Sequence, residues 1–202
     1  MICFLQTNIT NTFPHFLVYF NSALVPYKLY ILLNECSIIE MNREALSFRD
    51  IMSLVPTSVS ILSCIQNSLI YGCTISSLVS VNIDEKSPEI LFVLKNESLI
   101  GEKIKSGNSF SISVLASNQM GLAKKYSQER EPDLLSDETW NISDGFPKIQ
   151  GARVYLECEL AKVYESHAAN IFVGSISKYF GDLNQFALIY DARDYGRFNP
   201  LN

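Results

Sequence analysis

Small hydroxyl side chains crowd one short segment of the chain, residues 71–81. They belong to Thr74, Ser76, Ser77 and Ser80. Such groups can hydrogen-bond a phosphate, a polyol chain or a ring carbonyl. The aliphatic residues between them favour an extended strand, and Gly72 predicts a turn leading into it. An ordinary strand with a polar solvent face has the same composition, so the surrounding sequence must decide between the two interpretations.

The elements around this segment are those that would have to position its hydroxyls. Residues 48–55 have the apolar spacing of a helix, and Pro56 stops it. A strand is predicted over 59–65, with Val59 and Ile61 facing the core. A second strand is predicted over 90–94, and it leads into a polar loop at 95–98.

These motifs occur in an order that resembles the flavin reductase domain of two-component aromatic monooxygenases. The nearest type is the reductase partner of 4-hydroxyphenylacetate hydroxylase. The matching stretches include FRDIM from 48, PTSVSIL from 56, GCTISSLVSV from 72, LFVLKNES from 91, FSISVLASNQ from 110, GFPKIQGA from 145, and ALIY from 187 with Arg193 and Tyr195. Collinear matches run from about residue 48 to about residue 198, and their order and spacing are more specific than any single motif.

The resemblance implies a flavin site built largely from backbone groups and hydroxyls. The residues along the ring and ribityl chain would be Thr57, Ser58, Val59, Cys73, Thr74, Ile75, Ser76, Ser77, Ser80 and Val81. The flavin phosphate would meet Lys95, Asn96 and Ser98, because a lysine and hydroxyls suit a phosphate. Leu115, Ala116 and Gln119 would close the other side. At Ser58 many relatives carry glycine.

The nicotinamide side is less regular. Family members commonly use a histidine a few residues before the strand that here contains Phe172. His167 lies about two residues too early, and Ala169 falls at the expected position. Either the loop bulges and His167 still reaches the nicotinamide as the candidate catalytic residue, or the role is vacant. Tyr190, Arg193 and Tyr195 match a terminal motif that contacts the dinucleotide in relatives; the alternative is a capping strand and a surface tail.

The implied function is an NAD(P)H-dependent flavin reductase. It would transfer a hydride from NADH or NADPH to FMN or FAD, and a flavin-dependent monooxygenase would receive the reduced flavin. Because the cofactors carry this chemistry, few residues need to look catalytic. A non-catalytic flavin-binding or electron-carrying protein on the same fold is the alternative.

Several short strands and few helices predict a mainly β fold rather than a βαβ sheet. The resemblance implies a split β-barrel of Greek-key type, usually a homodimer with flavin near the subunit interface. Residues 153–163 alternate cleanly, so Tyr155 and Glu157 should face solvent. The irregular segment 127–144 is either an acidic surface loop or a lid, and Trp140 within it should be a packing anchor.

Composition sets the remaining limits. The chain has 202 residues, 48% of them hydrophobic, and a net charge of −5, which argues against a nucleic-acid partner. Five cysteines without a close pair and two histidines predict no metal site, no catalytic thiol and a reducing, cytoplasmic location.

The first forty residues differ from the rest of the chain. Their apolar run is broken by Pro14, Pro26 and Lys28, whereas a membrane-spanning helix needs about 20 largely apolar residues. We therefore expect no membrane association. Residues 1–40 are predicted to be a poorly structured extension, which an upstream start codon would explain, and residues 41–202 to be the flavin reductase-like, FMN-binding domain.

Overall fold

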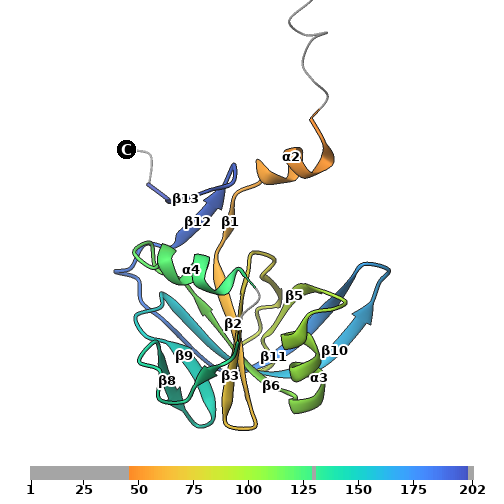
Figure 1. Ribbon diagram of the computed structural model, residues 1–202, viewed down its shortest axis with the longest axis vertical. Helices are drawn as coiled ribbons and strands as arrows, with labels where there is room; N and C mark the ends of the chain where they lie inside the picture. The colour runs from red at the N-terminus through yellow and green to blue at the C-terminus, as the bar shows by residue number, and fades with distance from the viewer. Residues whose placement is uncertain (1–45, 129–130, 200–202) are drawn as a thin grey trace, which may run out of the picture. The chain divides into compact units, whose positions relative to one another are not determined.

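The computed structural model describes residues 46–128 and 131–199, and the predicted extension 1–40 lies outside them. Contacts within the chain divide it into two units, Met1–Arg49 and Asp50–Asn202. The second unit contains all the strands of the described residues (Figure 1).

Strands dominate the described part of the chain. The helices are α2 (Phe48–Ser53), α3 (Leu99–Gly107) and α4 (Met120–Tyr126). The strands are β1 (Thr57–Ser58), β2 (Ser60–Gln66), β3 (Leu69–Ile75), β4 (Val79–Asn82), β5 (Glu89–Lys95), β6 (Ser109–Val114), β7 (Asp133–Leu134), β8 (Trp140–Ser143), β9 (Phe146–Ile149), β10 (Val154–Glu165), β11 (Ala169–Gly181), β12 (Leu188–Asp191) and β13 (Asp194–Arg197). None of these helices has both the length and the apolar character needed to span a bilayer.

One antiparallel sheet organises the described residues. Its strand order is β4-β5-β11-β10-β6-β2-β3-β7. The chain leaves β5, passes through α3 and enters β6, so that β11 and β10 lie between two strands that follow each other in sequence. A connection that skips neighbouring strands in this way is of the Greek-key type. Two smaller sheets, β1-β12-β13 and β8-β9, complete the structure (Figure 1).

Apolar side chains cover both faces of the middle of this sheet. On one face, Leu62 and Cys64 of β2 join Phe92, Phe110 and Phe172 in a first core. On the other face, Val59 and Ile61 join residues of α4, β8 and β9 in a second core. The inward position predicted for Val59 and Ile61 is confirmed, but β2 is buried on both faces and not on one alone.

The hydroxyl-rich segment is not one continuous strand. β3 ends at Ile75 and β4 begins at Val79. Gly72 lies inside β3, where Ser63 is its partner on β2, so the predicted turn at this glycine is wrong. The reason is packing: a side chain at position 72 would come within 3.1 Å of the Tyr126 ring and 3.3 Å of the Trp140 ring. A glycine inside a strand often allows such a close approach.

The prediction for β10 is also wrong at two positions. Tyr155 and Glu157 are buried, although the alternating pattern placed them in solvent. The β8-β9 hairpin covers this face of the strand: Lys148 of β9 lies over the Tyr155 ring, and Asp144 at the hairpin's turn pairs with Lys178 of β11. The Glu157 carboxylate is compensated by the same lysine, whose Nζ lies 3.4 Å away. Trp140 is buried in the second core, so its predicted anchoring role is confirmed.

Replacing Gly72 with alanine should destabilise the protein by about 1 kcal/mol, because two buried rings would have to give way. Denaturant unfolding measures the loss. Gly196→Ala is the matched control, since nothing lies within 4 Å of a side chain at that position in β13. Equal stability of the two variants would contradict the close packing described above.

Candidate functional site

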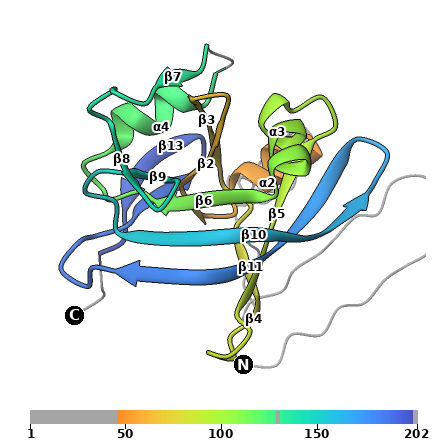
Figure 2. The same cartoon turned by 90° about the horizontal axis from the view of Figure 1, so that it is seen from below.

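A cleft lies over β3, and its residues come from three parts of the fold. β3 and the turn after it form the floor, up to Ser77. The end of β5 and the start of α3 form one wall, and the end of α4 with β7 forms the other. Figure 2 shows α3 on one side of β3 and α4 with β7 on the other. The cleft has a volume of about 1180 Å³, enough for a ligand of nucleotide size.

Two of the predicted hydroxyls hold the cleft's elements together. The Thr74 hydroxyl donates to the backbone oxygen of Ala123 in α4 at 2.8 Å. The Ser77 hydroxyl accepts from the backbone N–H of Val93 in β5 at 2.9 Å. Each hydroxyl therefore ties the floor to one wall. Ser76 also lines the cleft, and it is exposed.

The wall formed by α3 has the character of an anion site. Ser98 is the residue before the first turn of this nine-residue helix, and its side chain makes no capping bond. The first backbone N–H groups of a helix lack partners within it and carry partial positive charge. Lys95, Ser98 and Leu99 all line the cleft here, together with the acidic Glu97. A phosphate at this place would meet a lysine, a hydroxyl and a helix N-terminus.

Asn96, which was predicted to meet the flavin phosphate, makes its side-chain contacts with a neighbouring turn. Its side-chain amide donates to the backbone oxygens of Ser166 and His167, at 3.2 and 2.9 Å. Its own backbone N–H lies 3.4 Å from the oxygen of Ala168. Asn96 therefore joins the polar loop after β5 to the turn between β10 and β11. It does not line the cleft.

His167 lies on that turn and is exposed, outside the residues that line the cleft. Ala169, the position at which the resemblance led us to expect a histidine, pairs with Lys95 across β11 and β5. Because the Asn96 amide donates to the backbone oxygen of His167, the backbone of His167 is held beside the loop that carries Lys95 and Ser98.

Other predicted flavin residues lie away from this cleft. Thr57 and Ser58 form β1 and pair with Tyr190 and Ile189 of β12. Val59, Leu115 and Ala116 are buried in the second core or beside it. The Gln119 side chain is engaged at both ends: it accepts from the Ala116 N–H and donates to the Gln150 oxygen. Ser80 and Val81 lie on the exposed strand β4.

The three residues predicted for the dinucleotide lie on the hairpin of β12 and β13, and β12 pairs with β1. Tyr190 and Tyr195 are cross-strand partners whose rings meet edge to face, with centroids 5.1 Å apart. Arg193 forms an ion pair with Asp50. In the structure the predicted site residues thus lie in more than one place, with one group at the cleft and another at the C-terminal hairpin.

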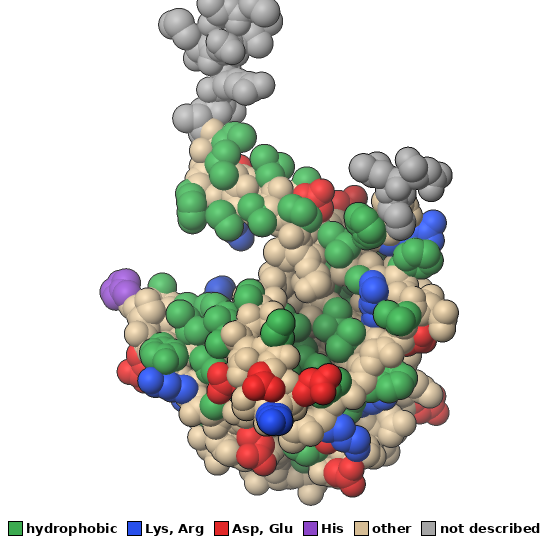
Figure 3. Space-filling model, turned by 180° about the vertical axis from the view of Figure 1, so that it is seen from behind, with side chains coloured by type: hydrophobic (Ala, Val, Ile, Leu, Met, Phe, Trp, Pro, Cys, Tyr) green, Lys and Arg blue, Asp and Glu red, His purple; other side chains and the backbone are tan. Residues whose placement is uncertain are grey.

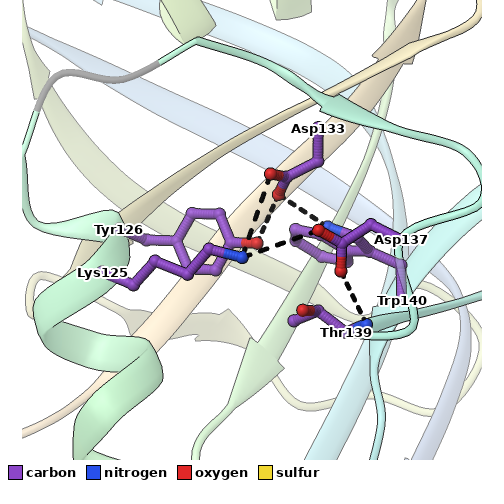
Figure 4. A network of polar contacts seen from close by, with 6 residues as sticks. All are labelled: Lys125, Tyr126, Asp133, Asp137, Thr139 and Trp140. Atoms are coloured by element: carbon purple, nitrogen blue, oxygen red, sulfur yellow. Dashed lines mark hydrogen bonds and ion pairs between the residues drawn. The ribbon is translucent and has the colours of Figure 1, made fainter.

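Tyr126 and Asp133 line the cleft and were not predicted. The Asp133 carboxylate is buried and accepts from the Tyr126 hydroxyl and, at 2.9 Å, from the Trp140 indole N–H (Figure 4). Lys125 Nζ lies 3.9 Å from the same carboxylate. The one sequence signal that could have found this wall is Gly72, a glycine in a strand pattern that makes room for the two rings.

Cys73 lines the cleft, but its thiol is not a nucleophile. Burial, and secondarily the nearby Cys64, raise the pKa of the Cys73 thiol to about 12. It therefore stays protonated at neutral pH, and a thiolate is needed for nucleophilic attack. Across residues 46–128 and 131–199, no group of three or more His, Cys, Asp or Glu side chains could hold a metal ion.

Residues 52–199 match the flavin reductase like domain family, and the chain belongs to this family. It is 27% identical over 156 residues to a flavin reductase of Pseudomonas putida, a match covering 76% of this chain and 90% of that protein. It is 25% identical over 159 residues to the NADH-dependent flavin reductase StyB of Pseudomonas fluorescens, covering 77% and 91%. Other relatives are named as reductase parts of monooxygenases, including one from Rhodococcus opacus.

The fold is shared with solved structures. The Streptomyces globisporus C-1027 NADH:FAD oxidoreductase SgcE6 superposes with a TM-score of 0.70 at 22% identity, covering 79% of this chain and 96% of that one. The predicted mainly β, split-barrel fold with few helices is confirmed.

Proposed function

We propose that this protein is a flavin reductase that transfers a hydride from NADH or NADPH to FMN or FAD. The observation that carries the proposal is the cleft over β3, which combines an uncapped helix N-terminus with a hydroxyl-bearing floor. It fits a flavin in size, and the only lysine among its described lining residues, Lys95, lies beside the start of α3. The relative StyB, by its name, is an NADH-dependent flavin reductase.

The residues of the cleft have different tasks in this proposal. Lys95, Ser98 and the first N–H groups of α3 bind the flavin phosphate. The floor from Cys73 to Ser77 lies along the ring and ribityl chain. The bound flavin supplies the hydride-accepting chemistry, so the chain's contribution is binding, orientation and exclusion of water.

His167 is our candidate on the nicotinamide side, because Asn96 holds its turn beside the proposed phosphate loop. Tyr190, Arg193 and Tyr195 remain predicted dinucleotide contacts. Their position with β1 would require the dinucleotide to extend beyond the cleft residues.

We further propose a homodimer, in which a second copy covers an apolar face of the sheet beside the cleft. Val93 of β5, Ile171 of β11 and Tyr164 of β10 are neighbours across paired strands, and all three are exposed. Val79 and Val81 of β4 extend this exposed set. Figure 3 shows hydrophobic side chains on the side of the molecule that carries β4. Val93 also lines the cleft, so a partner seated on this face would help to enclose the ligand.

The proposed recipient of reduced flavin is a flavin-dependent monooxygenase, since relatives of this chain are named as the reductase parts of such enzymes. A cytoplasmic location is proposed as well. It agrees with free thiols at Cys64, Cys73 and Cys158.

The proposed activity is tested by adding NADH or NADPH to the protein and oxidised flavin without oxygen. We expect loss of the yellow flavin absorbance with at least one of the two donors. A folded protein that binds flavin but leaves it oxidised with both donors would be a flavin carrier, and the proposed activity would be wrong.

Replacing both Lys95 and Ser98 with alanine should weaken FMN binding by about tenfold or more, because charge-assisted bonds to the phosphate are lost. Riboflavin has no phosphate, so its affinity should change by less than about twofold. Titration of flavin fluorescence measures both. Lys86→Ala, at an exposed turn outside the cleft, is the control. Equal losses for the two flavins would remove these residues from the phosphate role.

The double variant Val93→Asp with Ile171→Asp should be monomeric, because two carboxylates would be buried in an apolar interface. Light scattering during gel filtration gives the mass. Leu183→Asp is the control, since this leucine is 93% exposed and lies after the end of β11. A wild-type protein that elutes as a monomer would contradict the proposed dimer.

A further inference from the structure

The wall of the cleft opposite α3 depends on one buried carboxylate. Asp133 lies in β7, a strand of two residues at the edge of the sheet, where Ile70 of β3 is its partner. Only 4% of its side chain is exposed. A strand this short has little stability of its own. Side-chain contacts must therefore hold this part of the wall.

Three segments converge on that carboxylate (Figure 4). The Tyr126 hydroxyl comes from the end of α4, and the Trp140 indole N–H comes from the start of β8. Both donors point to the same oxygen of Asp133, and Lys125 approaches the other oxygen. Hydrogen bonds to an ionised acceptor are roughly twice as strong as neutral ones. The carboxylate thus joins α4, β7 and β8 into one wall.

The two rings held in this way also rest on the floor of the cleft. Tyr126 and Trp140 meet edge to face, with centroids 5.4 Å apart, and both pack against Gly72. Tyr126, Pro132 and Asp133 line the cleft across β3 from Lys95 and Ser98. The wall is therefore arranged by contacts within the protein alone. A ligand that binds a wall already in place need not supply the free energy of ordering it.

We propose that Asp133 is a positioning residue for flavin binding, which holds Tyr126 and the β7 segment as the cleft wall opposite the phosphate loop. This inference rests on the proposed function, and it assigns Asp133 no contact with the reacting atoms. Without the carboxylate, the wall keeps its backbone pairing with β3 but loses the bonds that join Tyr126 and Trp140 to β7, and the fraction of molecules ready to bind flavin falls. Apparent affinity falls by the same fraction.

The outer part of the network provides a matched control. Asp137 also pairs with Lys125, at 3.7 Å, and accepts from the Thr139 N–H. It bonds neither ring in these contacts and does not line the cleft. Asp137→Asn removes one negative charge near the same lysine, as Asp133→Asn does, but leaves the bonds from Tyr126 and Trp140 to Asp133 in place.

The experiment measures flavin affinity in Asp133→Ala, Asp133→Asn, Tyr126→Phe and Asp137→Asn. Trp140 is the only tryptophan of the sequence, so quenching of its emission by added FMN reports binding beside this wall. We expect the dissociation constant to rise about tenfold or more for Asp133→Ala and about threefold for Asp133→Asn and Tyr126→Phe. Asp137→Asn should remain within about twofold of wild type.

The rate of flavin reduction at saturating flavin separates positioning from general damage. For the Asp133 variants it should stay within about twofold of wild type, with the loss confined to flavin affinity. Unchanged affinity in folded Asp133→Asn and Tyr126→Phe would overturn the inference, even if Asp133→Ala fails to fold. Equal weakening by Asp137→Asn would also overturn it. A wild-type protein that binds no FMN would instead overturn the proposed function.

Discussion

The structure depends on burying the middle of its sheet on both faces. Strands β2, β6 and β10 lie side by side, and their second face carries polar residues such as Ser63, Ser111 and Ser113. Burying a hydroxyl without a hydrogen-bond partner is costly. Ser63 and Ser111 bond each other and the oxygen of Pro147, and Ser113 accepts from the N–H of Ile149. These bonds attach β9 to the sheet.

A series of contacts connects β9 to the cleft. β9 pairs with β8, and Trp140 at the start of β8 pairs with Ile149. Trp140 then contacts Asp133 and Gly72, which belong to the wall and the floor of the cleft. The burial of polar groups behind the sheet and the shape of the cleft before it are therefore parts of one packing arrangement.

Local patterns predicted much of this fold. The strand at 90–94 and the polar loop after it follow from short-range sequence, and the structure contains them as β5 and residues 96–98. The cleft wall could not be predicted in this way. Asp133 follows a proline in an irregular acidic segment, and its importance arises from Tyr126 and Trp140, whose positions depend on tertiary packing. The predicted solvent exposure of Tyr155 and Glu157 was wrong for the same reason, because alternation along a strand cannot reveal that a distant hairpin covers it.

The bonds made by Asn96 have a consequence for the turn that carries His167. Both acceptors of the Asn96 amide are main-chain oxygens, so the bonds do not depend on which side chains stand at positions 166 and 167. Insertion or deletion of a residue would move these oxygens, whereas substitution would leave them where they are. The fold therefore constrains the length of the turn. It does not constrain which amino acid stands at position 167, so that residue can be chosen to suit the group that binds beside it.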